Sequence, residues 1–169
     1  MRKLLKVALA AGALSAGAAH AGATSTTFPV TATVQATCSA TASPLGFGTY
    51  TPGVGPLTAN TPISVQCTQG TAFTVALNRG STTGGTIGQR LMANGTNTLQ
   101  YNLYTVAGLT TVFGDGTTGS TVGGTGAGVG VANAQTVTVY GQLPDNAVNQ
   151  AAVPSATPYS DLITVSITY

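Results

Sequence analysis

The chain has 169 residues, of which five are Lys or Arg and three are Asp or Glu, and its formal net charge is +2. This length suffices for one domain with a buried core. Three of the five cations lie within the first six residues, so the rest of the chain carries two arginines, three aspartates and a net charge of −1. So few cations leave no basic surface to neutralise phosphates, which argues against nucleic acids and anionic membranes as partners.

The first 21 residues have the form of a secretory signal peptide. Three cations precede an apolar run from Val7 to Ala19, and Ala19-His20-Ala21 has the small-x-small pattern that signal peptidase cleaves. The run is too short to span a bilayer, and no later stretch offers about 20 unbroken apolar residues. We therefore expect an exported chain that starts at Gly22 and has no transmembrane segment, no histidine and no lysine.

Period-two alternation of apolar and polar residues predicts an all-β chain. The alternating segments, in chain order, are residues 28–37, 63–67, 73–77, 99–103, 137–139 and 163–169. Gly, Pro, Asn and Thr separate them, and no segment sustains the apolar spacing of an amphipathic helix. This pattern is typical of an antiparallel β-sandwich in which each sheet buries one face.

Two Gly-rich stretches, residues 78–90 and 114–134, predict loops between these strands. The second holds eight glycines between Gly114 and Gly130. A loop of this length in a compact domain is usually functional or mobile. Its glycines alternatively reflect tight packing between neighbouring subunits, and the sequence does not distinguish the two interpretations.

Cys38 and Cys67 are the only cysteines of the chain, and in an exported protein we expect them to pair. The bridge would close a loop of about 30 residues and stabilise the fold by roughly 3–4 kcal/mol. A metal site would need further ligands, and the mature chain has neither His nor Glu to supply them. We therefore expect no metal.

Side chains that carry out catalysis are scarce. Without a histidine, the mature chain has no Ser–His or Cys–His relay. Asp115, Asp145 and Asp161 are far apart in sequence, so a glycosidase-like carboxylate pair is a weak alternative that a pocket joining two of them would revive. The G-x-G-x-x-G match at residues 114–119 lacks the helix that dinucleotide binding requires. We predict neither an enzyme nor a cofactor.

The two ends of the mature chain carry the most informative features. The alternating segment 28–37 is either the first strand of the chain's own sandwich or a strand for another molecule, because alternation does not reveal which molecule supplies the partner. At the other end, the sequence stops at Tyr169 within its last predicted strand.

The order of several segments resembles the spore coat protein U domain family, which includes subunits of archaic, Csu-type chaperone–usher pili. The matching stretches are FPVTATVQATC at residues 28–38, LGFG at 45–48, the strand at 63–67, YNLY at 101–104, VYGQL at 139–143 and YSDLITV at 159–165. The Gly-rich segment 114–134 departs from the family's pattern.

The resemblance implies an immunoglobulin-like antiparallel β-sandwich that lacks its last strand and is completed by donor-strand complementation. Residues 22–36 would be the donor extension, and residues 37–169 the incomplete pilin domain. The inserted side chains would be Phe28, Val30, Ala32, Val34 and Ala36. Residues 161–169 would border the acceptor groove, with the inward side chains Ile163, Val165, Ile167 and Tyr169.

The resemblance also implies a location and partners. The chain would be a structural subunit of a surface fimbria that polymerises head-to-tail and supports adhesion and biofilm formation. Its partners would be identical or related pilin subunits, a periplasmic chaperone and an outer-membrane usher. One alternative is a self-contained secreted coat or matrix protein. Another is a tip adhesin, for which 148 mature residues leave no room for a further receptor-binding domain.

Overall fold

The computed structural model describes residues 21–169, so the predicted signal peptide lies, apart from its last residue, outside the described residues. The described chain falls into two units, residues 21–33 and Val34–Tyr169. Residues 21–37 form no helix or strand, and their side chains are exposed. All the regular elements therefore belong to the second unit.

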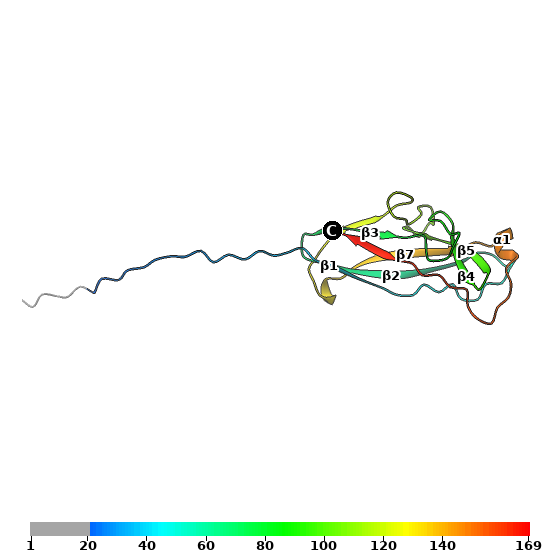
Figure 1. The fold of residues 1–169 in the computed structure, drawn as a ribbon, viewed down its shortest axis with the longest axis horizontal. Coiled ribbons are helices and arrows are strands. Elements are labelled where there is room, and N and C mark those ends of the chain that lie inside the picture. Colours follow the sequence, from blue (N-terminus) through cyan, green and yellow to red (C-terminus); the bar gives the residue numbers. More distant parts are fainter. Residues whose placement is uncertain (1–20) are drawn as a thin grey trace, which may run out of the picture. The chain divides into compact units, whose positions relative to one another are not determined.

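Figure 1 shows the second unit, which contains eight strands and two short helices among the described residues. The strands are β1 (Cys38–Ala42), β2 (Leu57–Cys67), β3 (Ala72–Leu77), β4 (Arg90–Asn94), β5 (Asn97–Tyr104), β6 (Val122–Thr125), β7 (Gln135–Leu143) and β8 (Val165–Thr168). The helices are the 3-10 helix η1 (Val131–Asn133) and the α-helix α1 (Ala147–Gln150).

The strands form two antiparallel sheets that pack face to face. One sheet has the order β1-β2-β7-β5-β4, and the other has the order β6-β3-β8. Figure 1 shows β2 and β7 in one layer and β3 in the other. Their inward side chains form the core, which contains Ile63, Val65, Cys67, Phe73, Val75, Leu77, Tyr101, Leu103, Phe113, Val137 and Val139. The prediction of an all-β, antiparallel β-sandwich is confirmed.

Four of the six predicted strands are present in the structure, and the first and last predicted strands differ from what was expected. Residues 63–67, 73–77, 99–103 and 137–139 lie within β2, β3, β5 and β7. The last strand covers only Val165–Thr168 instead of residues 161–169, because its partner β3 ends at Leu77, which pairs with Val165. Before that point, the Asn78 amide donates to the carbonyl of Thr164, and the Thr164 amide donates to the side-chain oxygen of Asn78 in place of a backbone carbonyl.

The expected strand at residues 28–37 is not formed. The first strand begins at Cys38, the residue that pairs with the end of β2. Of the described residues before Cys38, only Thr37 has a hydrogen-bond partner, through three hydrogen bonds with Thr68. A strand without a neighbouring edge has no ladder of hydrogen bonds to hold it, so alternation alone does not produce one.

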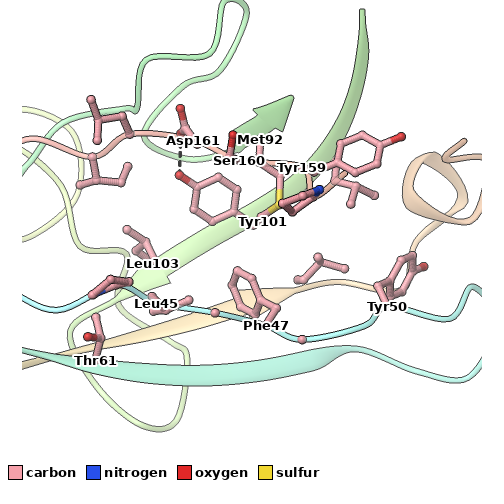
Figure 2. A pocket seen from close by; sticks show the side chains of 18 of the residues that line it. Leu45, Phe47, Tyr50, Thr61, Met92, Tyr101, Leu103, Tyr159, Ser160 and Asp161 are labelled. Carbon is pink, nitrogen blue, oxygen red and sulfur yellow. Dashed lines mark hydrogen bonds between the residues drawn. The ribbon is translucent and has the colours of Figure 1, made fainter. Parts of the chain in front are cut away.

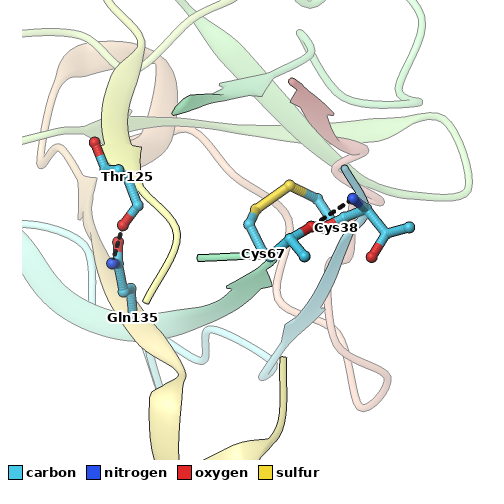
Figure 3. Close-up of a disulfide and its surroundings, with 6 residues drawn as sticks. Cys38, Cys67, Thr125 and Gln135 are labelled. Atoms are coloured by element: carbon cyan, nitrogen blue, oxygen red, sulfur yellow. Dashed lines mark hydrogen bonds between the residues drawn. A yellow bond between two sulfur atoms is a disulfide. The ribbon is translucent and has the colours of Figure 1, made fainter. Parts of the chain in front are cut away.

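The predicted disulfide between Cys38 and Cys67 is confirmed (Figure 3). The two residues face each other across β1 and β2, with their Cα atoms 4.1 Å apart. Cys67 is buried, so the bridge ties the first residue of β1 to the core.

The Gly-rich segment 114–134 packs closely on its own domain. Part of it forms β6, which pairs with β3. A side chain on Gly124 would meet the ring of Phe73 at 2.5 Å, and one on Gly126 would meet Cβ of Cys67 at 2.7 Å. At these two positions, glycine allows the segment to approach the core of the same subunit.

Candidate functional site

A cavity of about 1000 Å³ opens along one side of the sandwich. Two segments outside the strands flank it: residues 43–52, which follow β1 and are here called the first wall, and residues 152–164, which precede β8 and are called the second wall. Its floor is apolar and consists of Ile63, Leu77, Leu99, Tyr101, Leu103, Val139 and Leu143. Val165, the first residue of β8, completes the lining. We call this cavity the groove.

The first wall points two apolar side chains into the groove. Figure 2 shows Leu45 and Phe47 directed from this wall toward the floor. The ring of Phe47 meets that of Tyr101 edge-on, with 6.2 Å between their centroids. Beneath them lies Gly141 of β7, where an added Cβ would come within 3.0 Å of both Leu45 and Phe47. A glycine inside a strand often marks such a close approach.

The first wall is held at its two ends. Near β1, the hydroxyl of Thr61 donates to the carbonyl of Ser43 over 2.8 Å. At the far end, the Tyr50 hydroxyl donates to Oδ1 of Asp145 over 2.5 Å, and the Gly53 amide donates to the same oxygen over 3.0 Å. Between these anchors, the backbone of residues 44–49 forms no hydrogen bond to another described residue.

The second wall is organised around the carboxylate of Asp161. Oδ1 accepts hydrogen bonds from the amides of Ser81 and Thr82 at 2.9 Å and from both hydroxyls at 3.0 Å. Oδ2 accepts from the Tyr101 hydroxyl at 2.6 Å, a contact drawn in Figure 2. Burial raises the pKa of Asp161, but the hydrogen bonds from Tyr101, Thr82 and Ser81 outweigh it and the pKa is lowered. Burial and the bond to Asp161 raise the pKa of Tyr101.

Further hydrogen bonds hold the second wall from its outer side. Ser160 exchanges two backbone bonds with Ala93 of β4, at 2.9 and 3.0 Å. The side-chain amide of Asn94 donates to Ser155 Oγ and to the carbonyl of Thr157, each over 2.7 Å. The wall is thus bonded to β4 and to the loop that follows β3, and its other side faces the groove.

The groove lies where each sheet ends. Strand β1 is at the edge of the five-stranded sheet and β8 is at the edge of the three-stranded sheet, and the two strands lie close together. Each pairs on one side only among the described residues. An apolar groove beside unpaired sheet edges is a geometry that accepts an extended segment as an added strand.

The structure brings some of the predicted acceptor residues to the groove and places others elsewhere. Ile163 and Val165 line it and are half-buried. Ile167 packs against the core outside the groove lining, and the Tyr169 side chain is 59% exposed.

The side chains of all five predicted donor residues are exposed to solvent. The large apolar side chains Phe28, Val30 and Val34 are 80%, 85% and 83% exposed, and Ala32 and Ala36 are also exposed. In the four predicted strands that formed, by contrast, the inward apolar side chains are buried.

Sequence reasoning did not assign several residues that shape the groove. Leu45 and Phe47 entered only through the family resemblance, although the LGFG stretch itself alternates apolar residues with glycine. No pattern in the sequence indicated that Asp145 and Asp161 anchor the two walls. Their donors Tyr50 and Ser81 lie 95 and 80 positions away.

The three aspartates lie on separate segments, and each accepts hydrogen bonds from its own donors. Asp115 bonds the amides of Thr117 and Thr118 within its own turn. Among the described residues, no group of three His, Cys, Asp or Glu could hold a metal ion. No helix in this part of the chain is long and apolar enough to cross a membrane.

Comparison with known proteins gives a family and a fold. The model of the Spore Coat Protein U domain matches residues 24–166. A solved structure that resembles the chain is the CsuC–CsuE chaperone–tip adhesion subunit pre-assembly complex from archaic chaperone–usher Csu pili of Acinetobacter baumannii. The TM-score is 0.51 with 23% identity, over 81% of this chain and 40% of the other. This chain therefore spans about two fifths of that protein, and the likeness shows the fold. No curated protein matches the chain.

Proposed function

This chain belongs to the Spore Coat Protein U domain family, and we propose that it is a structural, non-enzymatic subunit of a surface pilus assembled by the chaperone–usher pathway. Residues 28–36 of one subunit enter the groove of the next and add a strand to its sheets. Because donor and acceptor are different surfaces, the contact does not close on itself and produces a head-to-tail filament. The filament supports adhesion and biofilm formation.

One observation carries this proposal. The sandwich has an apolar groove between two sheet edges, and the same chain has a strand-like segment that pairs with no strand among the described residues. Phe28, Val30 and Val34 would each gain roughly 1.5–3 kcal/mol on full burial. The unpaired backbone of residues 44–49 is available for hydrogen bonds to an inserted strand. Pro29 cannot donate such a bond, so it lies near one end of the pairing.

The route of assembly follows from the same groove. An exposed apolar groove is a hazard for a free subunit, because it recruits unintended strands. A periplasmic chaperone would cover it after export, and an outer-membrane usher would exchange the chaperone for the extension of the next subunit. The solved relative is itself a complex of a chaperone with a pilus subunit.

The test compares two substitutions in the extension that each introduce an aspartate, at neighbouring positions on opposite faces of the predicted strand. Val34→Asp changes a residue of the predicted apolar face, and Thr33→Asp changes its neighbour on the other face. Each variant and the unaltered chain are produced with a cognate chaperone and usher and run unboiled on a denaturing gel. We expect a multimer ladder for the unaltered chain and Thr33→Asp, and its loss for Val34→Asp.

Deletion of residues 22–36 separates the two interpretations of the extension. If it acts between subunits, the shortened chain folds with its chaperone and yields no ladder. If the full chain instead runs as a stable monomer and the deletion unfolds it, the segment belongs to its own sandwich. That outcome would support the self-contained coat protein.

A further inference from the structure

The surroundings of Asp161 are built to hold a carboxylate in one place. The loop at residues 79–82 wraps around it, and Gly80 in that loop is buried with φ +95°. A Cβ on Gly80 would lie 1.9 Å from Oδ2 of Asp161, so no other residue fits while the carboxylate stays in position. The loop and the aspartate are therefore matched to each other.

The carboxylate of Asp161 links three parts of the groove. It belongs to the second wall, it accepts four hydrogen bonds from Ser81 and Thr82 in the loop, and it accepts a fifth from Tyr101 in the floor. Hydrogen bonds to an ionised acceptor are roughly twice as strong as neutral ones. This aspartate is consequently the strongest polar anchor of the second wall.

The second wall needs such an anchor because Ser160 is the one residue in it that pairs with a strand. Strand β3 ends at Leu77, and beyond it the second wall is held on that side by Asn78, which exchanges two hydrogen bonds with Thr164, and by the loop that contains Ser81. Without a bound strand, the half-buried Ile163 would bury more apolar surface by moving across the groove toward Leu45 and Phe47. The bonds of Asp161 act in the opposite direction and keep the wall against the loop.

We propose that Asp161 is a positioning residue that holds the second wall open, at the width an incoming strand requires, before any strand is bound. This inference rests on the proposed function. Once a strand occupies the groove, its side chains separate the walls, and the contribution of Asp161 becomes small. Asp161 therefore acts mainly on the rate of strand acceptance and little on the stability of the occupied subunit.

The chain offers a control for each part of this argument. Asp115 is exposed and bonds only within its own turn, so Asp115→Asn changes the charge equally without touching the groove. Tyr101→Phe removes one hydroxyl from the set around Asp161. Gly80→Ala disturbs the same contact from the loop side.

The experiment measures how fast the full mature chain and its variants bind a fluorescein-labelled peptide of residues 24–37, supplied in excess and followed by anisotropy. We expect Asp161→Asn and Gly80→Ala to slow association about tenfold or more, and Tyr101→Phe about threefold. Asp115→Asn should bind at the unaltered rate. The melting temperature of the peptide-bound protein should be the same for Asp161→Asn as for the unaltered chain.

The outcomes distinguish a failure of the proposed function from a failure of the proposed role of Asp161. If the unaltered chain does not bind the peptide, the proposed function is wrong and this inference falls with it. If the unaltered chain and Asp161→Asn bind equally fast, the inference is wrong and the proposed function stands. A bound form of Asp161→Asn that melts at a much lower temperature would show a general structural role and would also overturn the inference. If Asp161→Asn does not fold, the slower binding of Tyr101→Phe decides the question.

Discussion

The hydroxyl of Tyr50 donates a hydrogen bond to Oδ1 of Asp145 over 2.5 Å, and this contact fixes the far end of the groove's first wall. Burial, the hydrogen bond and the negative charge of Asp145, in that order, raise the pKa of Tyr50 to about 12. The same bond lowers the pKa of Asp145, together with the bond from the Gly53 amide.

Asp145→Asn should therefore lower the pKa of Tyr50 from about 12 toward its ordinary value, since two of the three causes disappear. Burial remains, so the pKa should stay above about 10. Titration of the tyrosine absorbance measures the change, and Tyr50→Phe identifies which transition belongs to this residue. An unchanged titration of the Tyr50 phenol in Asp145→Asn would show that the contact is not formed in solution.

The stability of the folded chain should depend on pH only at the extremes. The pKa values of all three aspartates are lowered in the folded state. A lowered pKa means that the folded state holds the ionised form, so the stabilisation is present above the unfolded pKa near 3.9 and is lost as the pH falls through the folded pKa. The one histidine of the sequence, His20, belongs to the predicted signal peptide, so we expect no side chain of the predicted mature chain to titrate between about pH 5 and 9.

Urea unfolding at a series of pH values measures this profile. We expect a flat midpoint between about pH 5 and 9 and a decline below about pH 4, which should be shallower in Asp161→Asn. A midpoint that changes steeply near neutral pH would contradict the assignment of the titrating groups.

Arg90 is fully buried. Its guanidinium group finds its hydrogen-bond acceptors among carbonyl and amide oxygens of the core, and none of them is a carboxylate. Its nitrogens donate to the carbonyls of Asn78, Ile87 and Phe113 and to Oδ1 of Asn102. Lysine has three donors on one nitrogen and cannot reach acceptors arranged around a planar fork. Arg90→Lys should lower the free energy of unfolding by about 3 kcal/mol, because buried acceptors lose their partners.

The matched control is Arg79, which is exposed and donates one hydrogen bond, to the carbonyl of Gly85. Arg79→Lys should change the free energy of unfolding by no more than about 0.5 kcal/mol. Urea denaturation of both variants gives the comparison. Equal stabilities of the two variants would mean that the network around Arg90 contributes nothing specific.

Gly141 sets the depth at which the first wall packs over β7. A methyl group there would press on Leu45 and Phe47 at 3.0 Å and move both side chains into the groove. Gly141→Ala should therefore weaken binding of the peptide of residues 24–37 by about tenfold. Gly88→Ala is the control, since a Cβ at that position has no atom within 4 Å and the residue does not line the groove. Equal binding by the two variants would show that the groove's width does not depend on this contact.

The central strands could be predicted from the sequence because their signal is local. In β2, the alternation of Ile63, Val65 and Cys67 with polar residues reflects a strand buried on one face, and the structure shows that burial. The pairing of Cys38 with Cys67 followed from the export signal and the count of cysteines. Neither inference required knowledge of distant contacts.

The candidate site could be predicted only in part because its walls are set by distant contacts. Residues 161–164 have a strand-like pattern, yet their conformation depends on where β3 ends and on Asn78 and Ser81. The alternation at residues 28–37 is equally regular, but a strand needs a neighbouring edge that this pattern does not supply. The groove was implied by resemblance, whereas the roles of Asp145, Asp161 and Gly141 emerge only from the folded structure.

The most direct test of the central claim is a complementation between two defective subunits. Val34→Asp disables the extension and leaves the groove intact, and Ile163→Asp disables the groove and leaves the extension intact. The two variants, carrying different tags, are produced separately and together with the chaperone and usher and run unboiled on a denaturing gel. We predict monomers for each variant alone and a one-to-one heterodimer that grows no further for the mixture. A mixture that contains only monomers, while the unaltered chain still forms its ladder, would contradict insertion of the extension into the groove.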